Sequence, residues 1–432
     1  MFAKSKIFVG RIILVIICIT PLVFWLLLEP LGRRFSDLNS TLTSLGQIFA
    51  LLGFSLFAIV IMLAARLKFV EDYFHGLNRV YINHHFLGGV AFILLLFHPL
   101  WLTAKYAVAS SYSAALFLLP DLHNPAKTLG GTALGLMLVL LIITFYLSLK
   151  YHVWKLSHKF LALAFTIGFT HMLLIPSDVS RHPGLKIYMV ILAAGAFFSI
   201  LYRVLFSRGL IKKYHYSIVA INKLNRGVIE IVMKPAANER LEFQPGQFAF
   251  FSFIAPGLSR EYHPFSFTSS PAEELLKIIV KALGDFTVTL SDKLKVGSPV
   301  FIEGPFGRFV SHGQKQIWLA GGIGVTPFIS MAQNIPTTTE VDFFYSAISE
   351  TDLLWREELI SLSSAQKNFH FFPHFSSTAG HLTAEMIKSK SQNFIAKEIF
   401  ICGPPPMMRS LKKQFINLGV SSHNIHTEEF SL

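Results

Sequence analysis

Four histidines in the apolar first half of the chain form two pairs with nearly equal spacing. His84 and His98 are fourteen positions apart (98−84), and His158 and His171 are thirteen apart (171−158). At a rise of about 1.5 Å per residue, each pair spans roughly 20 Å along a helix. An imidazole in hydrocarbon is costly without a partner, and neutral imidazole nitrogen is a standard axial ligand of haem iron. The spacing therefore predicts two haems, one near each membrane face, with iron bound by all four histidines.

Two of these positions have a competing interpretation. His84 and His158 stand at predicted helix ends, where a histidine can snorkel to headgroups or bond a backbone carbonyl. That alternative fits His98 and His171 poorly, because they interrupt the apolar runs AFILLLFHPLW and AFTIGFTHMLL. His85 competes with His84, since it would match the thirteen-residue spacing of the second pair. Spacing by itself leaves this choice open.

The elements that must hold these histidines are membrane helices. The chain has 432 residues, of which 52% are hydrophobic, and its mean hydropathy of +0.52 is too high for one soluble domain. Thirteen positions put His158 and His171 on different faces of an ideal helix, so we expect either a distorted helix, with the distortion at Gly168, or two haems that are offset. Six segments approach the roughly 20 residues that span a bilayer, namely residues 7–28, 45–65, 86–104, 128–149, 159–176 and 185–206.

An even number of spans places both ends of the helical region on one side of the membrane. Lys and Arg cluster before residue 12 and near residues 66–79, 150–159 and 203–213, and such basic flanks are cytoplasmic. The first segment has features of a secretory signal, but it is too long and lacks an A-x-A cleavage site. We therefore expect an uncleaved helix, in an integral protein of the bacterial inner membrane.

On this topology His84 and His158 would bind the inner haem, and His98 and His171 the outer one. The net charge of +13 then reflects topology and contact with anionic lipid, and we expect neither a nucleic-acid partner nor an obligate protein partner. The two cysteines allow neither a disulfide framework nor a cysteine-based metal site. Histidines in predicted loops are expected to be solvated and not ligands: His75, His123, His152 and His182.

The second half has the pattern of two soluble folds. From Lys315 onward QIWLAGG, VDFFYSAI, NFHFFPHF and EIFIC alternate with helical stretches, which predicts a doubly wound α/β domain. The predicted fold is membrane α followed by soluble β and α/β, with domains at residues 1–208, 209–312 and 313–432. Six runs before Lys315, divided by Gly, Pro and Asn turns, predict an antiparallel β-barrel: YHYSIVAI, GVIEIVMKP, GQFAFFSF, PFSFTSS, LLKIIVKAL and SPVFIEGPFG.

A glycine-rich turn, Gly321-Gly322-Ile323-Gly324-Val325-Thr326-Pro327, joins a predicted strand to a helix. It is not a Walker loop, because no Lys follows its glycines, and it is not G-x-G-x-x-G. Glycines there would let the backbone approach a pyrophosphate at the helix N-terminus, where free N–H groups favour anions. A turn that binds no ligand would have similar residues, so the turn alone leaves both possibilities open.

The order of the motifs in the second half resembles the ferredoxin-NADP reductase family. When the helices with the paired histidines are included, nearly the whole chain resembles the NADPH oxidase and ferric reductase superfamily. The histidine spacing of that superfamily matches His84 and not His85. The motifs are His263-Pro264-Phe265-Ser266-Phe267-Thr268-Ser269-Ser270-Pro271, Gly284-Asp285-Phe286-Thr287, Glu303-Gly304-Pro305-Phe306-Gly307, the glycine turn, Cys402-Gly403-Pro404-Pro405-Pro406-Met407 and Glu429-Phe430.

This resemblance implies roles for the matching residues. His263, Pro264, Phe265, Ser266 and Thr268 fall in the flavin-strand motif, with Ser266 near the isoalloxazine and Phe265 against the FAD. Gly284, Asp285, Phe286 and Thr287 match a loop that binds the FAD pyrophosphate. Gly321, Gly322, Gly324, Thr326 and Pro327 would hold the phosphates of NADPH or NADH, while Cys402, Gly403 and Pro404 would border the nicotinamide. Soluble relatives often have Arg in place of His263 and Tyr in place of Phe265. For the prolines and phenylalanines of these motifs, ordinary strand packing is the alternative to a cofactor-binding role.

Two further positions bear on the nucleotide. Phe430 matches the family aromatic that stacks on the flavin where nicotinamide must bind. We therefore expect Phe430 to act as a gate that nicotinamide must displace. The alternative is that Phe430 only anchors the last strand by packing. Ile348 stands where a related NADPH enzyme often has Arg, and Arg356 follows a few residues later. We therefore expect only a weak preference between NADPH and NADH.

The resemblance implies a flavocytochrome that passes electrons from cytosolic NAD(P)H through FAD and two b-type haems to an acceptor across the membrane. Oxygen as the acceptor would make the protein a superoxide-producing oxidase, and a ferric chelate would make it a metalloreductase. Two other classes are a haem-free six-helix transporter with a nucleotide-sensing domain, and a membrane-anchored reductase that serves a separate oxygenase.

Overall fold

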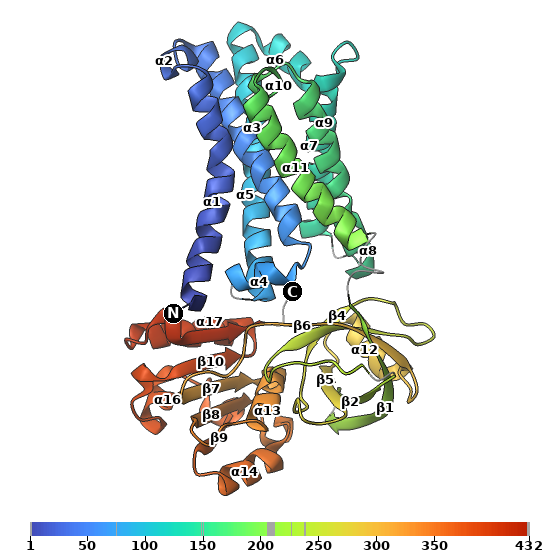
Figure 1. The fold of residues 1–432 in the computed structure, drawn as a ribbon, viewed down its shortest axis with the longest axis vertical. Coiled ribbons are helices and arrows are strands. Elements are labelled where there is room, and N and C mark those ends of the chain that lie inside the picture. Colours follow the sequence, from blue (N-terminus) through green and yellow to red (C-terminus); the bar gives the residue numbers. More distant parts are fainter. Residues whose placement is uncertain are drawn as a thin grey trace. The chain divides into compact units, whose positions relative to one another are not determined.

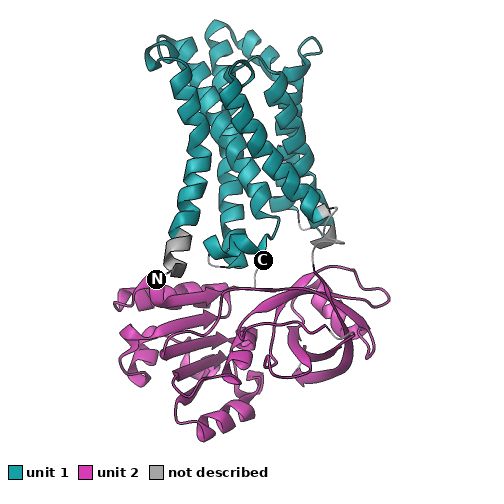
Figure 2. Cartoon of the chain, viewed as in Figure 1, with its two compact units in different colours: residues 1–210 teal, residues 211–432 magenta. Residues whose placement is uncertain are grey.

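The computed structural model describes residues 2–74, 76–147, 149, 151–204, 212–225, 227–236 and 239–429. The chain divides into two compact units, Met1–Leu210 and Ile211–Leu432 (Figure 2). Each unit has hydrophobic core clusters of its own. The predicted domain boundary between residues 208 and 209 lies outside the described residues.

The first unit is a bundle of helices (Figure 1). Among the described residues, five helices are long and apolar enough to cross a membrane. These five correspond to five of the six predicted spans. They are α1 (Phe2–Leu28), α3 (Leu38–Leu63), α5 (Leu77–Ala109), α7 (Pro125–Tyr146) and α11 (Pro183–Val204), and the short helices between them include α2 (Leu31–Arg34), α4 (Lys68–Phe74), α6 (Ser111–Leu118) and α10 (Asp178–Arg181).

The remaining predicted span, residues 159–176, is interrupted. It is formed by α9 (Leu161–Leu174), whose 14 residues extend about 21 Å, less than the roughly 30 Å of bilayer hydrocarbon. A separate helix, α8 (Tyr151–Lys159), precedes it. Five of the six predicted spans are thus full-length helices, and the other is the shorter helix α9, which is separate from α8.

The segment that carries His158 and His171 is interrupted at Phe160, between α8 and α9. The predicted distortion at Gly168 is therefore wrong. The Phe160 N–H donates to the Ser157 carbonyl at 3.0 Å, and its own carbonyl accepts from Leu163 at 2.9 Å, which are the tight bonds of a 3₁₀ turn. Helix α9 continues through Gly168 without a break. A Cβ at Gly168 would lie 3.7 Å from Cβ of Ala133 on α7, an ordinary packing distance. The change of direction between His158 and His171 therefore comes from the α8–α9 junction.

Glycines on α3 let α5 lie close beside it. A Cβ at Gly46 would lie 3.1 Å from Cδ2 of Leu102, and one at Gly53 would lie 2.8 Å from Cγ of Leu95. The two glycines are about two helical turns apart and therefore face the same way. Close backbone approach of this kind favours helix association in a membrane, where van der Waals packing replaces the hydrophobic driving force. The approach also brings side chains of α5 within reach of the α3 backbone.

The second unit begins with a six-stranded antiparallel sheet in the order β4-β3-β6-β1-β2-β5, whose strands coincide with the six predicted runs (Figure 1). Its two edge strands meet, because Phe267 after β4 bridges Ile278 of β5 and the Thr268 N–H donates to the Lys277 carbonyl at 2.9 Å. The sheet therefore curls until its edges touch at this point. The strands are β1 (Tyr214–Asn225), β2 (Val228–Pro235), β3 (Phe248–Phe253), β4 (His263–Ser266), β5 (Leu276–Lys281) and β6 (Pro299–Phe306).

A parallel sheet in the order β11-β10-β7-β8-β9 follows, and it is doubly wound as predicted. Phe328 of α13 and Leu359 of α14 belong to the core on one face, while Ile387 of α16 and Phe415 of α17 belong to the core on the other. The elements are β7 (Lys315–Gly321), α13 (Thr326–Ala332), β8 (Glu340–Ala347), α14 (Arg356–Ala365), β9 (Phe369–Phe375), α16 (Ala384–Lys390), β10 (Glu398–Cys402), α17 (Pro405–Asn417) and β11 (Ile425–Glu428).

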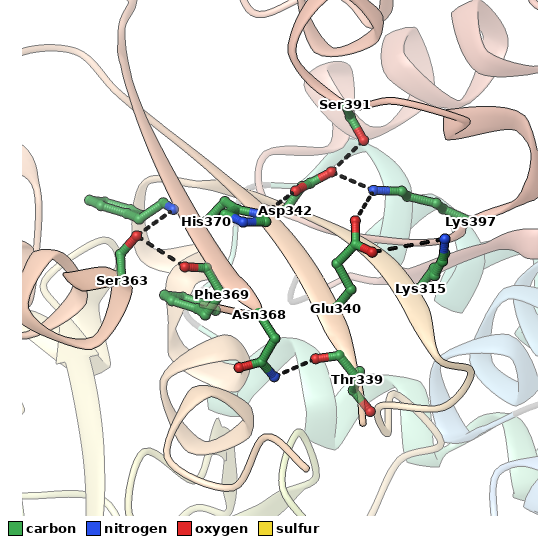
Figure 3. Close-up of polar contacts among 11 residues, drawn as sticks. Lys315, Thr339, Glu340, Asp342, Ser363, Asn368, Phe369, His370, Ser391 and Lys397 are labelled. Atoms are coloured by element: carbon green, nitrogen blue, oxygen red, sulfur yellow. Dashed lines mark hydrogen bonds and ion pairs between the residues drawn. The ribbon is translucent and has the colours of Figure 1, made fainter. Parts of the chain in front are cut away.

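A buried charge cluster joins β8 to the segment before β10 (Figure 3). Lys397 Nζ lies 2.7 Å from Asp342 Oδ2 and 3.0 Å from Glu340 Oε1, while Ser391 Oγ and His370 Nδ1 donate to Asp342 at 2.5 and 2.9 Å. Burial would raise the pKa of Asp342, but the hydrogen bonds, that of Lys397 first, hold it below its ordinary value. Burial would lower the pKa of Lys397, yet its bonds to the two carboxylates raise it. Both groups therefore stay charged at neutral pH.

Candidate functional site

The four histidines of the first unit form two pairs of facing rings. The ring centres of His98 on α5 and His171 on α9 are 6.5 Å apart, and those of His84 on α5 and His158 on α8 are 6.1 Å apart. A metal ion lies roughly 3 Å from the centre of an imidazole that binds it, so two axial imidazoles have ring centres roughly 6 Å apart. The structure thus brings together the predicted partners at the separation that a shared iron requires.

Backbone carbonyls orient three of these rings. His98 Nδ1 lies 2.8 Å from the Gly46 carbonyl, and His171 Nδ1 lies 2.7 Å from the Ala126 carbonyl. His84 Nδ1 makes the same kind of contact, at 2.9 Å, with the carbonyl of Val60 on α3. A carbonyl only accepts, so each Nδ1 carries the proton and each Nε2 keeps a lone pair for a metal. This arrangement of donors fits two bis-histidine haems.

His158 is held differently. Its ring stacks on Trp154 of α8, with centres 5.5 Å apart and planes 18° apart. Its Nδ1 is buried and has no hydrogen-bond partner within the described part of the chain. His85 is exposed, whereas the ring of His84 is half-buried and faces His158, which favours His84 as the ligand.

The histidines expected to be solvated give a mixed picture. His123 is exposed and His182 is half-buried. His75 and the side chain of His152 lie outside the described residues. Their expected lack of a ligand role stays a prediction.

Glycines shape the space around His171. A Cβ at Gly130 of α7 would lie 2.8 Å from Nδ1 of His171, which is closer than real Cβ contacts come. Only glycine lets this ring lie against α7 and reach the carbonyl of Ala126. Positions Gly131 and Gly135 on the same helix have no atom within 4 Å of a built Cβ. The α7 surface at Gly131 and Gly135 is therefore open.

At the end of β4 in the second unit, two buried hydroxyls lack hydrogen-bond partners. Ser266 Oγ and Thr268 Oγ1 are both enclosed, and neither finds an acceptor or donor among the described residues. A buried hydroxyl without a partner costs free energy, so such groups mark places where a ligand or water completes the bonding. Phe265 is half-buried and packs one side on Phe251 and Phe253. The predicted flavin strand thus offers two unpaired hydroxyls, which fits a bound FAD.

The strand is fixed at both of its ends. After β4, the Ser330 hydroxyl of α13 donates to the Ser269 carbonyl at 2.7 Å, and Ser270 Oγ contacts Asn334 Oδ1 at 2.8 Å. At the start of β4, His263 stacks on Phe286 with ring centres 3.6 Å apart. Pro264 is half-buried in the middle of the strand.

Residues 284–287 are the first turn of a helix and not the predicted loop. Gly284 caps α12 (Asp285–Lys293), and Thr287 Oγ1 accepts from the Gly284 N–H at 3.0 Å. Asp285 accepts from the N–H of Phe286 at 2.7 Å. The Thr287 hydroxyl is thus already used to close the turn. Backbone N–H groups at this helix end remain the groups that would favour an anion.

Close approach explains several glycines of the glycine turn and of the turn after β10. A Cβ at Gly324 would lie 2.4 Å from the Cys402 carbonyl oxygen, and one at Gly321 would lie 2.5 Å from Met407 Sδ. Gly403 in turn lies against the backbone of Gly321. Gly322 differs, because its φ is +54° and no atom lies within 4 Å of a built Cβ. It is thus the glycine that leaves the backbone open to a ligand.

Other residues assigned to the nucleotide are buried in the fold. Thr326 and Pro327 are enclosed, and the Thr326 hydroxyl donates to the Ile323 carbonyl at 3.1 Å. Cys402 is fully enclosed, so burial raises the pKa of its thiol, and the nearby Glu428 carboxylate raises it further. This thiol stays neutral and faces away from solvent, whereas Pro404 is exposed. Phe430 lies outside the described residues.

An apolar helical unit with paired histidines, followed by flavin-type and nucleotide-type folds, defines a transmembrane oxidoreductase. Three family models match the chain in sequence: a ferric reductase-like transmembrane component at residues 49–169, an FAD-binding domain at 213–310 and an oxidoreductase NAD-binding domain at 318–413. This combination of domains matches the NADPH oxidase and ferric reductase superfamily.

Curated relatives cover half of the chain or less. It is 26% identical over 211 residues to the reductase component of propane 2-monooxygenase from Mycolicibacterium goodii, spanning 44% of this chain and 60% of that protein. It is 30% identical over 205 residues to the glycine betaine monooxygenase reductase subunit of Pseudomonas aeruginosa, spanning 44% and 56%. The chain thus covers under two thirds of these relatives.

Solved structures are similar at lower identity. A ferredoxin NADP+ reductase from Neisseria gonorrhoeae with bound FAD and NADP is 19% identical, covers 51% of this chain and 99% of its own, and has a TM-score of 0.45. The flavohemoglobin of Malassezia yamatoensis is 16% identical over 90% of this chain and 98% of its own, with a TM-score of 0.54. The second similarity concerns the fold alone.

Proposed function

We propose that this protein moves electrons from NAD(P)H, by way of FAD and two b-type haems, across the membrane to an acceptor on the far side, with molecular oxygen as that acceptor. The observation that carries the proposal is the pairing of His98 with His171 and of His84 with His158. A transporter without haem, or an anchored reductase for a separate oxygenase, would have no use for histidine pairs at two depths.

The residues of the chain would bind and orient the cofactors. Bound FAD would supply the conversion of a two-electron hydride donor into single electrons, which is the form that haem iron could accept. The carbonyls of Gly46 and Ala126 would hold the outer imidazoles with Nε2 directed at iron. Ser266 and Thr268 would give their unpaired hydroxyls to the flavin. None of these groups needs to transfer a proton.

A ferric chelate is the second candidate acceptor. It is favoured by the match to a ferric reductase-like transmembrane component. Exposed Arg33 and Arg181 lie at the end of the bundle where α1 finishes and α11 begins, and they would attract an anionic chelate. Arg34 does not contribute to such attraction, since it is buried against Trp25 and paired with Asp178 at 2.9 Å.

Haem content of matched variants tests the cofactor assignment. The purified wild type should yield two extractable haems per chain, and His98→Ala or His171→Ala should remove one of them and keep the other. His123→Ala, which alters an exposed histidine of the same unit, should keep both. A wild-type ratio near one, or equal haem loss in His123→Ala, would contradict the assignment. Superoxide and ferrous-iron assays on the NAD(P)H-reduced protein then decide between the two acceptors.

A further inference from the structure

Three potential metal ligands from distant parts of the sequence meet in the nucleotide-type fold. His426 Nε2 on β11 lies 2.8 Å from Glu398 Oε2 at the start of β10, and His312 Nε2, before β7, lies 3.8 Å from the same oxygen. One ligand atom from each residue lies within 4.8 Å of the other two. Within the part of the chain that the structure describes, no other group of three His, Cys, Asp or Glu side chains meets this condition.

Hydrogen bonds of Gln316 hold the loop that carries His312 in place. Buried Gln316 donates from Nε2 to the Gly313 carbonyl at 2.8 Å and bonds the Ser311 hydroxyl, while its Oε1 accepts from Trp318 Nε1 at 2.7 Å. These contacts fix the loop residues on both sides of His312. Preorganised side chains lose little freedom when they bind a ligand.

The tautomer of His312 suits a metal. Its Nδ1 lies 2.9 Å from the Val310 carbonyl, so Nδ1 carries the proton and Nε2 faces Glu398 with a lone pair. A hydrogen bond from the second ring nitrogen to a carbonyl is the usual companion of a metal-bound imidazole. Gly313, with φ of +85°, allows the close approach, since a Cβ there would lie 2.8 Å from Glu398 Cγ.

We propose that His312, Glu398 and His426 form a binding site for a divalent transition metal of the Zn²⁺ type. Two imidazoles and one carboxylate, with a fourth position open to water, are a ligand set that zinc takes in tetrahedral geometry. Binding of Mg²⁺ or Ca²⁺ is not expected here, because these ions prefer oxygen ligands to imidazole nitrogen. Small shifts of side chains suffice, because Zn–N and Zn–O bonds of about 2 Å require ligand atoms roughly 3.3 Å apart.

The site is separate from the predicted nucleotide site. Glu398 and Cys402 are the first and last residues of β10, so about 13 Å of strand separates them. A bound ion would connect the loop before β7, strand β10 and the edge strand β11. Strand β11 leads directly into the last residues of the chain. The metal would therefore bind strand β11 to its neighbour β10 in the sheet. The site does not depend on which acceptor is used or on whether haem is bound.

Equilibrium dialysis of the purified full-length protein against Zn²⁺, with elemental analysis, tests the site. Wild type should bind one Zn²⁺ per chain, and His312→Ala and Glu398→Gln should each weaken binding at least tenfold. Glu398→Gln keeps the size of the side chain and its capacity to hydrogen-bond His426, so it tests the ligand if other variants fold poorly. His423→Ala, an exposed histidine near β11 outside the cluster, should bind as wild type does.

X-ray absorption at the zinc edge gives an independent readout. We expect two imidazoles and oxygen ligands at about 2.0 Å from the zinc in wild type, with one imidazole lost in His312→Ala. Zinc binding that is equal in wild type, His312→Ala and Glu398→Gln, or absent from wild type at 100-fold excess, would overturn the proposal. FAD absorbance and haem content, which should match among the variants, show that each protein is folded.

Discussion

The ring of His171 lies so close to Gly130 that a Cβ there would be 2.8 Å from Nδ1 of the histidine. The same nitrogen lies 2.7 Å from the carbonyl of Ala126, one helical turn earlier on α7. The glycine and the carbonyl together define where the imidazole can lie. If His171 binds the proposed haem, Gly130 would be important for haem binding although it touches no metal.

Gly130→Ala should therefore reduce outer haem binding. The added methyl must displace the His171 ring by several tenths of an ångström or more, which breaks the bond to Ala126 and misdirects Nε2. We expect a tenfold to hundredfold loss of outer haem affinity, the range seen when an orienting partner is removed. Haem extraction and the redox titration of the two haems measure the change.

The control for this prediction is Gly131→Ala. No atom lies within 4 Å of a Cβ at Gly131, and both glycines are on the same helix, so the change in helix propensity is matched. Equal haem content in the two variants would show that the contact with His171 does not matter.

Loss of the unpaired hydroxyls of β4 should weaken flavin binding. Ser266→Ala and Thr268→Val each remove one buried hydroxyl. If each donates one hydrogen bond to FAD, the affinity should fall about fivefold per site, as expected for about 1 kcal/mol. Ser291→Ala, which removes an exposed hydroxyl of α12, should leave FAD binding unchanged. Flavin fluorescence titration that finds both hydroxyl variants equal to wild type would remove these residues from the site.

The buried charge cluster predicts a pH window for stability. The pKa of Asp342 is held low, so its contribution exists above its ordinary pKa and is lost as pH falls through the lowered value. The pKa of Lys397 is raised, so its contribution exists below its ordinary pKa and is lost as pH rises through the raised value. The stabilisation from both groups should therefore be greatest between these limits.

Lys397→Met should destabilise the second unit strongly, because Asp342 would then be a buried charge without its main partner. A loss of about 3–5 kcal/mol is expected when one member of a buried pair is removed. Lys388→Met, which breaks the exposed Lys388–Glu385 pair, should cost less than about 1 kcal/mol. Thermal unfolding followed by flavin release measures both, and equal losses would contradict the importance of the cluster.

The protein should show only a weak preference between NADPH and NADH. A substitution of Ile348 should change this preference. Ile348 is 69% exposed just after β8, and Arg356 is paired with Glu350 at 2.7 Å. Ile348→Arg would supply a free guanidinium for a 2′-phosphate, which should favour NADPH at least tenfold. Ile360→Arg, at another exposed isoleucine, should not. A wild-type preference of a hundredfold, about 2.7 kcal/mol, would contradict the prediction.

The sequence predicts the elements and the paired histidines well because these depend on local patterns. An ionisable residue within an apolar run is conspicuous, as at His98, and apolar runs divided by turn residues define all six strands of the first sheet. The break at Phe160 depends instead on how α8 and α9 pack, so the pattern misplaced it at Gly168. The stack of His263 on Phe286 and the cluster of His312 with His426 join distant positions, and no spacing predicts them.

Spectra of the purified protein during anaerobic addition of NADH or NADPH test the central claim most directly. We predict two haems per chain, bleaching of the flavin and reduction of both haems before oxygen enters, and reoxidation of both when oxygen is admitted. Reduction of the flavin without any change in the haem bands, or a protein that contains no haem when purified from haem-replete cells, would contradict the proposed transfer of electrons across the membrane.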